Sequence, residues 1–263
     1  MRAFLALPQS SPALLASLMG TILVTWLATV WLMGGMDAGP GTPLGGFGWF
    51  VVTWVIMMAA MMLPSELRFA LVFSQLSRDA DGEQERLSPT WLFLGGYLLT
   101  WTAYGVLAYL VDWAARILAP AFFAWDRQGP LIAGVTLLAA GAYQLSPLKQ
   151  ACLRHCISPV SFFMQRWRSG TVGAVRMGIE HGVFCVGCCW GLMFVLFALG
   201  MMSLLWMSVL ALVMFAEKVV PWGVRLSRPL AIALTLLGIW VALAPETVPG
   251  LTTPHARPHA SHP

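Results

Sequence analysis

The chain has 263 residues, of which 59% are hydrophobic and 10% are charged. Soluble globular domains carry about 25% charged residues, so this composition excludes an ordinary soluble domain and predicts an integral membrane protein. The net charge of +4 gives no reason to expect nucleic-acid binding, and no phosphate-binding loop or nucleophile–base pair indicates catalysis.

Apolar runs long enough to cross a bilayer as helices recur along the chain. We predict an all-α, polytopic transmembrane helix bundle that forms a single domain over residues 1–250, with a disordered tail containing His and Pro over 251–263. A break at Gly200–Ser203 divides the apolar run from Val183 to Ala216, which is too long for one span. The seven predicted spans are 12–33, 48–65, 90–111, 130–146, 180–199, 203–217 and 228–244.

The basic residues are distributed unevenly between the two sides of this predicted bundle. Arg116, Arg127 and Arg257 fall on one side, and the remaining Lys and Arg residues fall on the side of the N-terminus. The positive-inside rule therefore predicts a cytoplasmic N-terminus, whereas six spans would place the tail inside as well. All 5 cysteines would then lie near the cytoplasmic face, where cellular reductants keep thiols available as ligands.

A methionine cluster comes first along the chain, at the end of the second predicted span. Met57, Met58, Met61 and Met62 stand just before Pro64, where we expect the helix to end. Thioethers are soft, uncharged ligands that bind Cu(I) and discriminate against hard ions. The alternative is that these methionines fill irregular gaps between helices.

Two cysteines follow the fourth predicted span. Cys152 and Cys156 are four residues apart and would share one face of a helix, with His155 beside them. They could meet thiols of the fifth span at the same membrane face. Alternatively, the segment is an amphipathic interfacial helix whose cysteines are incidental.

The fifth predicted span carries the densest group of metal-binding residue types. At 100° per residue, His181, Cys185, Cys188 and Cys189 fall on one side of a helix. Thiolate and imidazole are ligands that late transition metals prefer, so the pattern predicts a metal or redox site. Glu180 could support it, although a free cysteine is also a common buried hydrophobe.

A charged pair, Glu217 and Lys218, ends the sixth predicted span. Adjacent residues on a helix do not face one another, so we do not expect a salt bridge between them. The expected arrangement is a Lys that extends towards the membrane surface and a solvated Glu. With no acidic residue then in the middle of a span, a metal transporter is disfavoured.

Three long motifs resemble those of a bacterial family of predicted metal-binding integral membrane proteins. They are Met57–Ser65, Tyr143–Lys149 together with Cys152 and Cys156, and Gly182–Met193. The resemblance covers roughly residues 48 to 223. It implies a polytopic membrane fold but brings no established activity. The metal-binding positions that it implies are Met57, Met58, Met61, Met62, Cys152, Cys156, Cys185, Cys188 and Cys189.

Together these patterns predict a multi-pass protein of the bacterial inner membrane that binds a soft metal ion. Cu(I) is the expected metal, and Zn is the alternative. The protein would deliver this metal to a metalloenzyme or metallochaperone partner, or act in the maturation of such an enzyme, without catalysing a reaction. One alternative is a thiol–disulfide oxidoreductase that uses Cys188 and Cys189, or Cys152 and Cys156, with a quinone. A metal transporter and a helical scaffold with incidental thiols remain open. The predicted metal ligands are Cys185, Cys188, Cys189, Cys152, Cys156, His181, Met57, Met58, Met61 and Met62.

Overall fold

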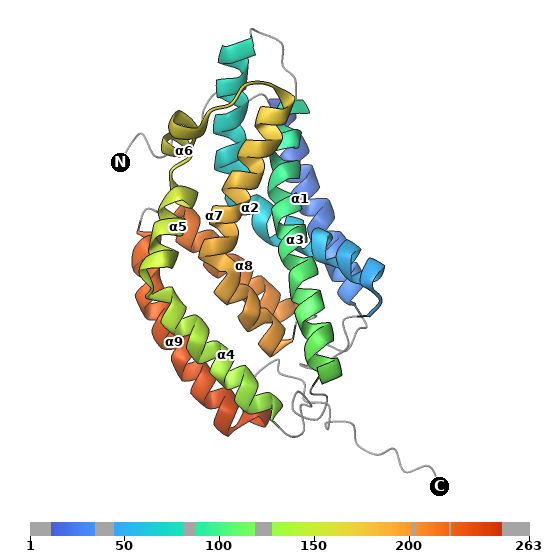
Figure 1. The fold of residues 1–263 in the computed structure, drawn as a ribbon, viewed down its shortest axis with the longest axis vertical. Helices are drawn as coiled ribbons and strands as arrows, with labels where there is room; N and C mark the ends of the chain where they lie inside the picture. Colours follow the sequence, from blue (N-terminus) through green and yellow to red (C-terminus); the bar gives the residue numbers. More distant parts are fainter. Residues whose placement is uncertain are drawn as a thin grey trace.

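The computed structural model describes residues 12–34, 45–81, 88–118, 128–200, 203–220 and 222–248 (Figure 1). Apart from the turns between elements, these residues are helical, so the predicted all-α class is confirmed. The tail over 251–263 lies outside the described residues. The helices are α1 (Pro12–Met33), α2 (Phe47–Asp81), α3 (Ser88–Leu118), α4 (Gly129–Gln144), α5 (Pro147–Ile157), α6 (Pro159–Arg166), α7 (Gly170–Leu199), α8 (Leu204–Val219) and α9 (Gly223–Leu243), followed by the short 3₁₀ helix η2 (Pro245–Thr247).

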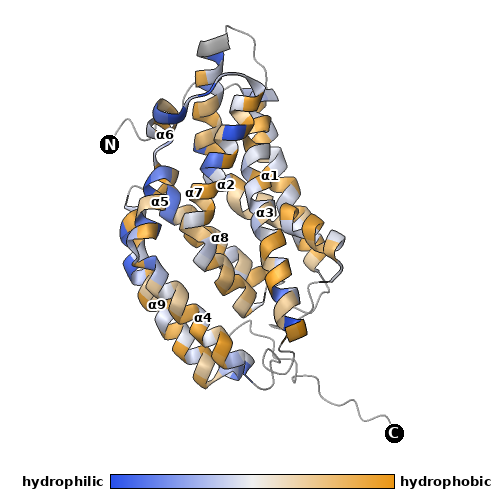
Figure 2. Cartoon of the chain, in the orientation of Figure 1, coloured by the Kyte–Doolittle hydropathy of each residue, from blue (hydrophilic) through white to orange (hydrophobic). Residues whose placement is uncertain are grey.

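Five helices in the described part of the chain are long and apolar enough to cross a membrane: α1, α2, α3, α7 and α9. The pair α4 and α5, bent by 66°, becomes a sixth if it counts as one broken span. Helix α8 has 16 residues, which is short for a span. The prediction of seven spans therefore stays a prediction, as does the side on which the N-terminus lies. Figure 2 shows largely hydrophobic ribbon along α4 and α9 and hydrophilic segments at α5 and α6.

Helix α7 is the central element of the fold. It packs most extensively against α3 and also contacts α4, α5 and α8, while α4 pairs with α9. Glycines permit the close approach of α3 and α7, because a Cβ at Gly178 would meet the backbone of Phe93. This pairing leaves one face of α7 turned towards α2, α5 and α8, and this face carries the cysteines. Two buried clusters of side chains fill the interior, one around the cysteines and one around Phe69, Phe73 and Phe93.

The expectation that Pro64 ends a helix is wrong. Helix α2 continues through Pro64 to Asp81, so that Glu66 lies inside a long helix and is buried. Proline removes one backbone hydrogen bond, yet long apolar helices tolerate it when neighbouring helices hold the chain in place. Packing of α2 against α1, α3 and α8 supplies that support.

The predicted break between the fifth and sixth spans is confirmed. Helix α7 ends at Leu199, and Gly200 has a φ of 110°, in the left-handed region that favours glycine. Helix α8 begins at Leu204, so α7 and α8 form a helical hairpin. This hairpin lets α8 run back along α7 towards the level of the cysteines.

Candidate metal centre

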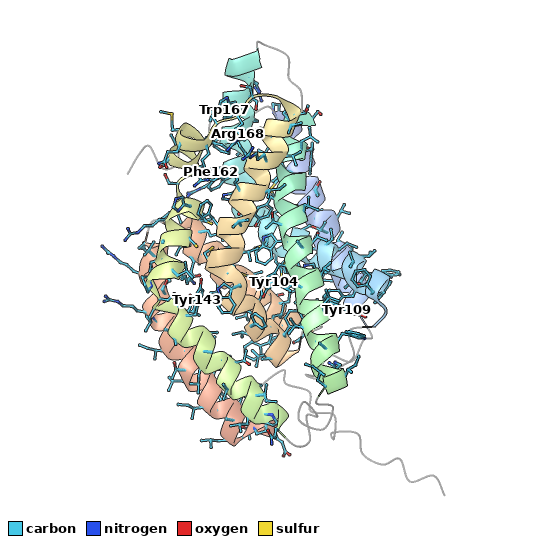
Figure 3. All side chains as sticks on the ribbon, viewed as in Figure 1. Tyr104, Tyr109, Tyr143, Phe162, Trp167 and Arg168 are labelled. Atoms are coloured by element: carbon cyan, nitrogen blue, oxygen red, sulfur yellow. The ribbon has the colours of Figure 1, made fainter. Side chains whose placement is uncertain are left out.

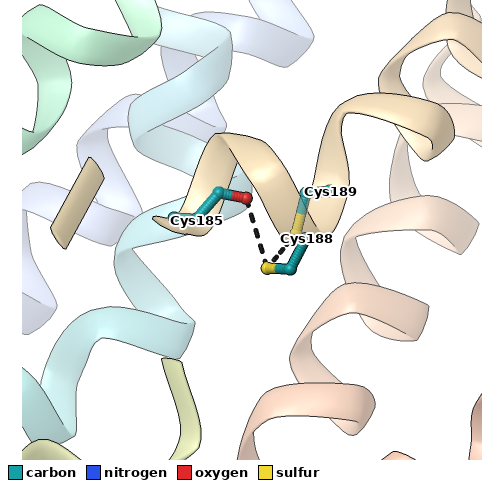
Figure 4. Close-up of side chains that lie close together, drawn as sticks. All are labelled: Cys185, Cys188 and Cys189. Carbon is teal, nitrogen blue, oxygen red and sulfur yellow. Dashed lines mark hydrogen bonds between the residues drawn. The ribbon is translucent and has the colours of Figure 1, made fainter. Parts of the chain in front are cut away.

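Three thiols lie together on one turn in the middle of α7. The sulfur atoms of Cys185, Cys188 and Cys189 are all within 4.8 Å of one another, and all three residues are buried (Figure 4). The Sγ atoms of Cys188 and Cys189 are 3.4 Å apart, and the Cys188 thiol also donates to the Cys185 carbonyl at 3.2 Å. The sequence spacing predicted this shared face.

Helix α5 brings a fourth thiol to the group. The Cys156 Sγ lies 3.7 Å from the Cys188 Sγ, and Cys156 is buried. Helix α5 starts where Ser146 caps it, with the Ser146 Oγ accepting from the Lys149 backbone N–H at 3.1 Å. This defined start fixes which residues of α5 face α7.

Cys152, one turn earlier on α5, lies at the edge of the group. It is partly exposed and sits against Gly187 of α7, where an added Cβ would be 2.7 Å from the Cys152 Sγ. The Tyr143 hydroxyl donates to the Gly187 carbonyl, which ties α4 to the same turn of α7 (Figure 3). Cys152 is therefore the thiol of this group that lies nearest to the surface of the helix bundle.

Lys218 is a member of the site that the sequence reasoning missed. Its Nζ donates to the Cys185 Sγ at 2.9 Å, and Lys218 is 3% exposed. The Tyr97 hydroxyl, from α3, is 3.0 Å from the same sulfur. The expectation of a Lys that reaches the membrane surface is wrong, because α8 turns this side chain inwards against α2 and α7. A positive charge beside Cys185 compensates the negative charge that a thiolate carries.

Glu66 and His181 continue this buried polar chain. The Glu66 carboxylate accepts from Lys218 at 3.2 Å, and its other oxygen is 2.6 Å from the His181 Nε2. The His181 ring stacks on Phe69 with centroids 3.9 Å apart, while its Nδ1 has no hydrogen-bond partner among the described residues. His181 therefore forms a hydrogen bond with Glu66, and on α7 it lies one helical turn before Cys185.

A second buried ion pair lies beside the site, and it corrects the expectation for Glu217. Glu217 is 1% exposed and accepts from the Lys149 Nζ at 2.7 Å. Lys149 also donates to Gln144, and the Ser227 hydroxyl donates to Glu217 at 3.3 Å. This pair joins α4, α5, α8 and α9, so it holds α5 and its cysteines in place.

The predicted methionine cluster is buried in the same hydrophobic core as the thiols. Met57, Met58, Met61 and Met62 are each at most 1% exposed and belong to the same contiguous core cluster as the cysteine trio. Their position is compatible both with gap filling and with a role as soft ligands.

Glu180 lies away from the thiols. It forms ion pairs with Arg166, Arg168 and Arg176 at 3.2 to 3.4 Å, at the end of the molecule where α7 begins (Figure 3). His155, the other side chain noted beside the α5 cysteines, stacks on Phe184 with centroids 4.3 Å apart. Both residues therefore stabilise the arrangement of α5, α6 and α7.

A comparison with protein-family models finds a match to PpoB2, described as a copper chaperone, over residues 51–241. No curated protein and no solved structure matches the chain. The matched range contains all five cysteines, the four predicted methionines and both buried ion pairs. Because this match covers well over half of its length, the chain belongs to the PpoB2 copper chaperone family.

Proposed function

We propose that this protein holds Cu(I) in a membrane-embedded thiol site and delivers it to a metalloenzyme or metallochaperone. The observation that carries the proposal is the buried trio Cys185, Cys188 and Cys189, whose sulfur atoms lie within 4.8 Å of one another. Soft thiolates select Cu(I) over hard cations, and membership of a copper chaperone family favours copper over zinc.

The charge of the surrounding side chains is compatible with Cu(I) at this position. Cu(I) bound by two or more thiolates has a net negative charge, which is costly in a buried site unless a cation lies near. Lys218 supplies that cation at 2.9 Å from the Cys185 sulfur. The Tyr97 hydroxyl, 3.0 Å from the same atom, offers an additional hydrogen bond to a thiolate.

The remaining predicted ligands have different roles in this proposal: completing the site, exchanging copper, holding Lys218 in place or binding copper weakly. Cys156 completes the buried group from α5, and the partly exposed Cys152 exchanges copper with a partner. His181 stabilises Glu66 and thereby Lys218. Met57, Met58, Met61 and Met62 supply weaker thioether ligands next to the thiols.

The proposed setting is the bacterial inner membrane, with seven spans, a cytoplasmic N-terminus and the arginine-rich end of α7 towards the cytoplasm. The long apolar helices support a membrane location. Several arginines at the start of α7 support the orientation by the positive-inside rule.

Metal analysis of anaerobically purified protein tests this function. Wild-type protein loaded with Cu(I) should retain about one copper per chain after removal of free metal, as expected for a single sulfur site. The double variant Cys185→Ser/Cys188→Ser should retain little, and Ser17→Ala on the lipid-side helix α1 serves as a control. Equal copper in the wild type and the cysteine variant would refute the proposal.

A thiol oxidoreductase is a second candidate, favoured by the closeness of the sulfur atoms. The separation of 3.7 Å between the Cys156 and Cys188 sulfur atoms, on two different helices, is short enough for a disulfide to form after small movements. Such an enzyme should reduce a quinone with stoichiometric oxidation of thiols and should contain no bound copper.

A metal transporter is a third candidate. The lack of acidic residues within the spans no longer argues against it, since Glu66 and Glu217 are both buried in helices. Net Cu(I) uptake into sealed proteoliposomes that lack any acceptor would favour this function over delivery.

A further inference from the structure

Three further methionines, all on α7 and α8, are buried in the same core as the cysteine trio. Met193 on α7 and Met207 and Met214 on α8 are each at most 1% exposed. They belong to one contiguous cluster with Cys185, Cys188 and Cys189 and with the four methionines of α2. Met207 and Met214 are seven residues apart and share one face of α8. The packing of α2, α7 and α8 places them in one cluster with Met193 and the methionines of α2.

Lys218 fixes the relative level of these three helices. It lies on α8, 2.9 Å from the Cys185 sulfur on α7 and 3.2 Å from the Glu66 carboxylate on α2. Positions along α2, α7 and α8 can therefore be counted from this shared level, because an α-helix rises about 1.5 Å per residue.

Counted this way, the methionines of α7 and α8 lie on one side of the thiols. Met214 precedes Lys218 by one turn, about 6 Å along α8, and Met207 precedes it by about 16 Å. Met193 follows Cys185 by about 12 Å along α7. Because α7 and α8 form a hairpin, these opposite directions along the chain point to the same end of the molecule (Figure 1).

The four methionines of α2 lie on the same side. They precede Glu66 by about 6 to 13 Å along the helix. The end of α2 lies near the start of α7 (Figure 1), so the residues before Glu66 point towards the end of α7. The packing of α2 against α8 brings them beside the α8 methionines.

The other side of the shared level holds few methionines. Around His181, on the side of the arginine-rich end, the interior is packed with the aromatic rings of Phe69, Phe93 and Phe162. Of the eight buried methionines on α2, α7 and α8, Met177 alone lies on this side, and the other seven lie on the opposite side of the thiols, in a core that Phe50 and Trp54 share. Gap filling alone does not account for so uneven a distribution.

We propose that these seven methionines form a thioether column along which Cu(I) leaves the thiol trio towards the end of the molecule opposite the arginine-rich end. This inference rests on the proposed function, because the trio must first hold Cu(I). Thioethers are neutral and soft, so they bind Cu(I) more weakly than thiolates and exchange it more readily. Cys152, on the outer side of the trio, provides the access point, and the column provides the exit. The thioether column consists of Met57, Met58, Met61, Met62, Met193, Met207 and Met214.

The test uses the triple variant Met193→Leu/Met207→Leu/Met214→Leu in the full-length protein. Leu and Met have similar volumes, so the core should stay packed. The control is Met19→Leu/Met164→Leu, which replaces methionines that are 50% and 78% exposed. Copper content is measured first, and then the rate at which a membrane-impermeant Cu(I) chelator removes the metal from right-side-out and from everted vesicles.

The wild type and the control should release Cu(I) to the chelator at the vesicle face where the column ends. The triple variant should hold the same copper but release it there at least about tenfold more slowly, as expected if a step loses about 1.4 kcal/mol of stabilisation. Release at the other face should be unchanged. Equal rates of copper release by the triple variant and the wild type at both faces would refute the proposed thioether column. A loss of bound copper in the triple variant would also refute it, because these methionines would then belong to the storage site. Wild-type protein that binds no copper would instead refute the proposed function itself.

Discussion

Replacing Lys218 by Leu should weaken copper binding strongly. At 2.9 Å, a unit positive charge and a thiolate attract one another by about 6 kcal/mol at an effective dielectric constant of 20. Roughly half of this should remain as a net effect, because Leu avoids the cost of burying an ammonium group. A loss of about 3 kcal/mol corresponds to a dissociation constant for Cu(I) about 150-fold higher.

The second buried lysine provides a matched control. Lys149 is 0% exposed and pairs with Glu217 much as Lys218 pairs with Glu66. Lys149→Leu should destabilise the fold by a similar amount, about 3 to 5 kcal/mol for a broken buried pair. It should lower the affinity of the folded fraction far less than Lys218→Leu does, because it loosens α5 and Cys156 but leaves the trio on α7 and its cation in place. Thermal unfolding in detergent measures the first quantity, and competition with a Cu(I) chelator measures the second.

A double variant separates the loss of charge from the loss of stability. Lys218→Leu/Glu66→Gln removes both charges of the pair, so no unpaired carboxylate remains buried and much of the stability should return. Copper affinity should stay low, because the thiols still lack their cation. Wild-type affinity in this double variant, or an equal loss of affinity in Lys149→Leu, would show that the charge of Lys218 does not stabilise bound copper.

Two further predictions concern the contact between α5 and α7. Gly187→Ala places a methyl group 2.7 Å from the Cys152 Sγ, so α5 should shift away from α7. This shift should lower the free energy of unfolding by about 1 to 3 kcal/mol and move Cys156 away from Cys188. Thermal unfolding should then show a lower transition temperature, and chelator competition should show weaker copper binding. An unchanged transition temperature and affinity would mean that α5 is not held against this turn. Cys152→Ser should leave the equilibrium copper content unchanged but slow loading from a Cu(I)–chelator complex, measured by stopped-flow absorbance. A loading rate equal to that of the wild type would exclude Cys152 as the access point.

The local part of the site was predictable from the sequence. The spacing of Cys185, Cys188 and Cys189 places them on one helical turn whatever surrounds the helix, and the structure keeps them together. The turn at Gly200 was also predictable, because a residue that tolerates positive φ stood where an overlong apolar run had to reverse.

The parts that depend on tertiary packing were not predictable. Treating Glu217 and Lys218 as neighbours on one helix hid the fact that they point to different partners, Lys149 and Glu66. Treating Pro64 as a helix end hid the burial of Glu66. One available signal was that charged residues inside long apolar segments are costly and generally paired, which would have directed attention to partners on other helices.

The coordination of bound copper tests the central claim most directly. X-ray absorption spectroscopy of the anaerobically Cu(I)-loaded protein should show copper coordinated by sulfur alone, with a shell that loses sulfur neighbours in Cys185→Ser/Cys188→Ser. A spectrum dominated by nitrogen or oxygen neighbours in the wild type, or one that does not change in this cysteine variant, would contradict the account.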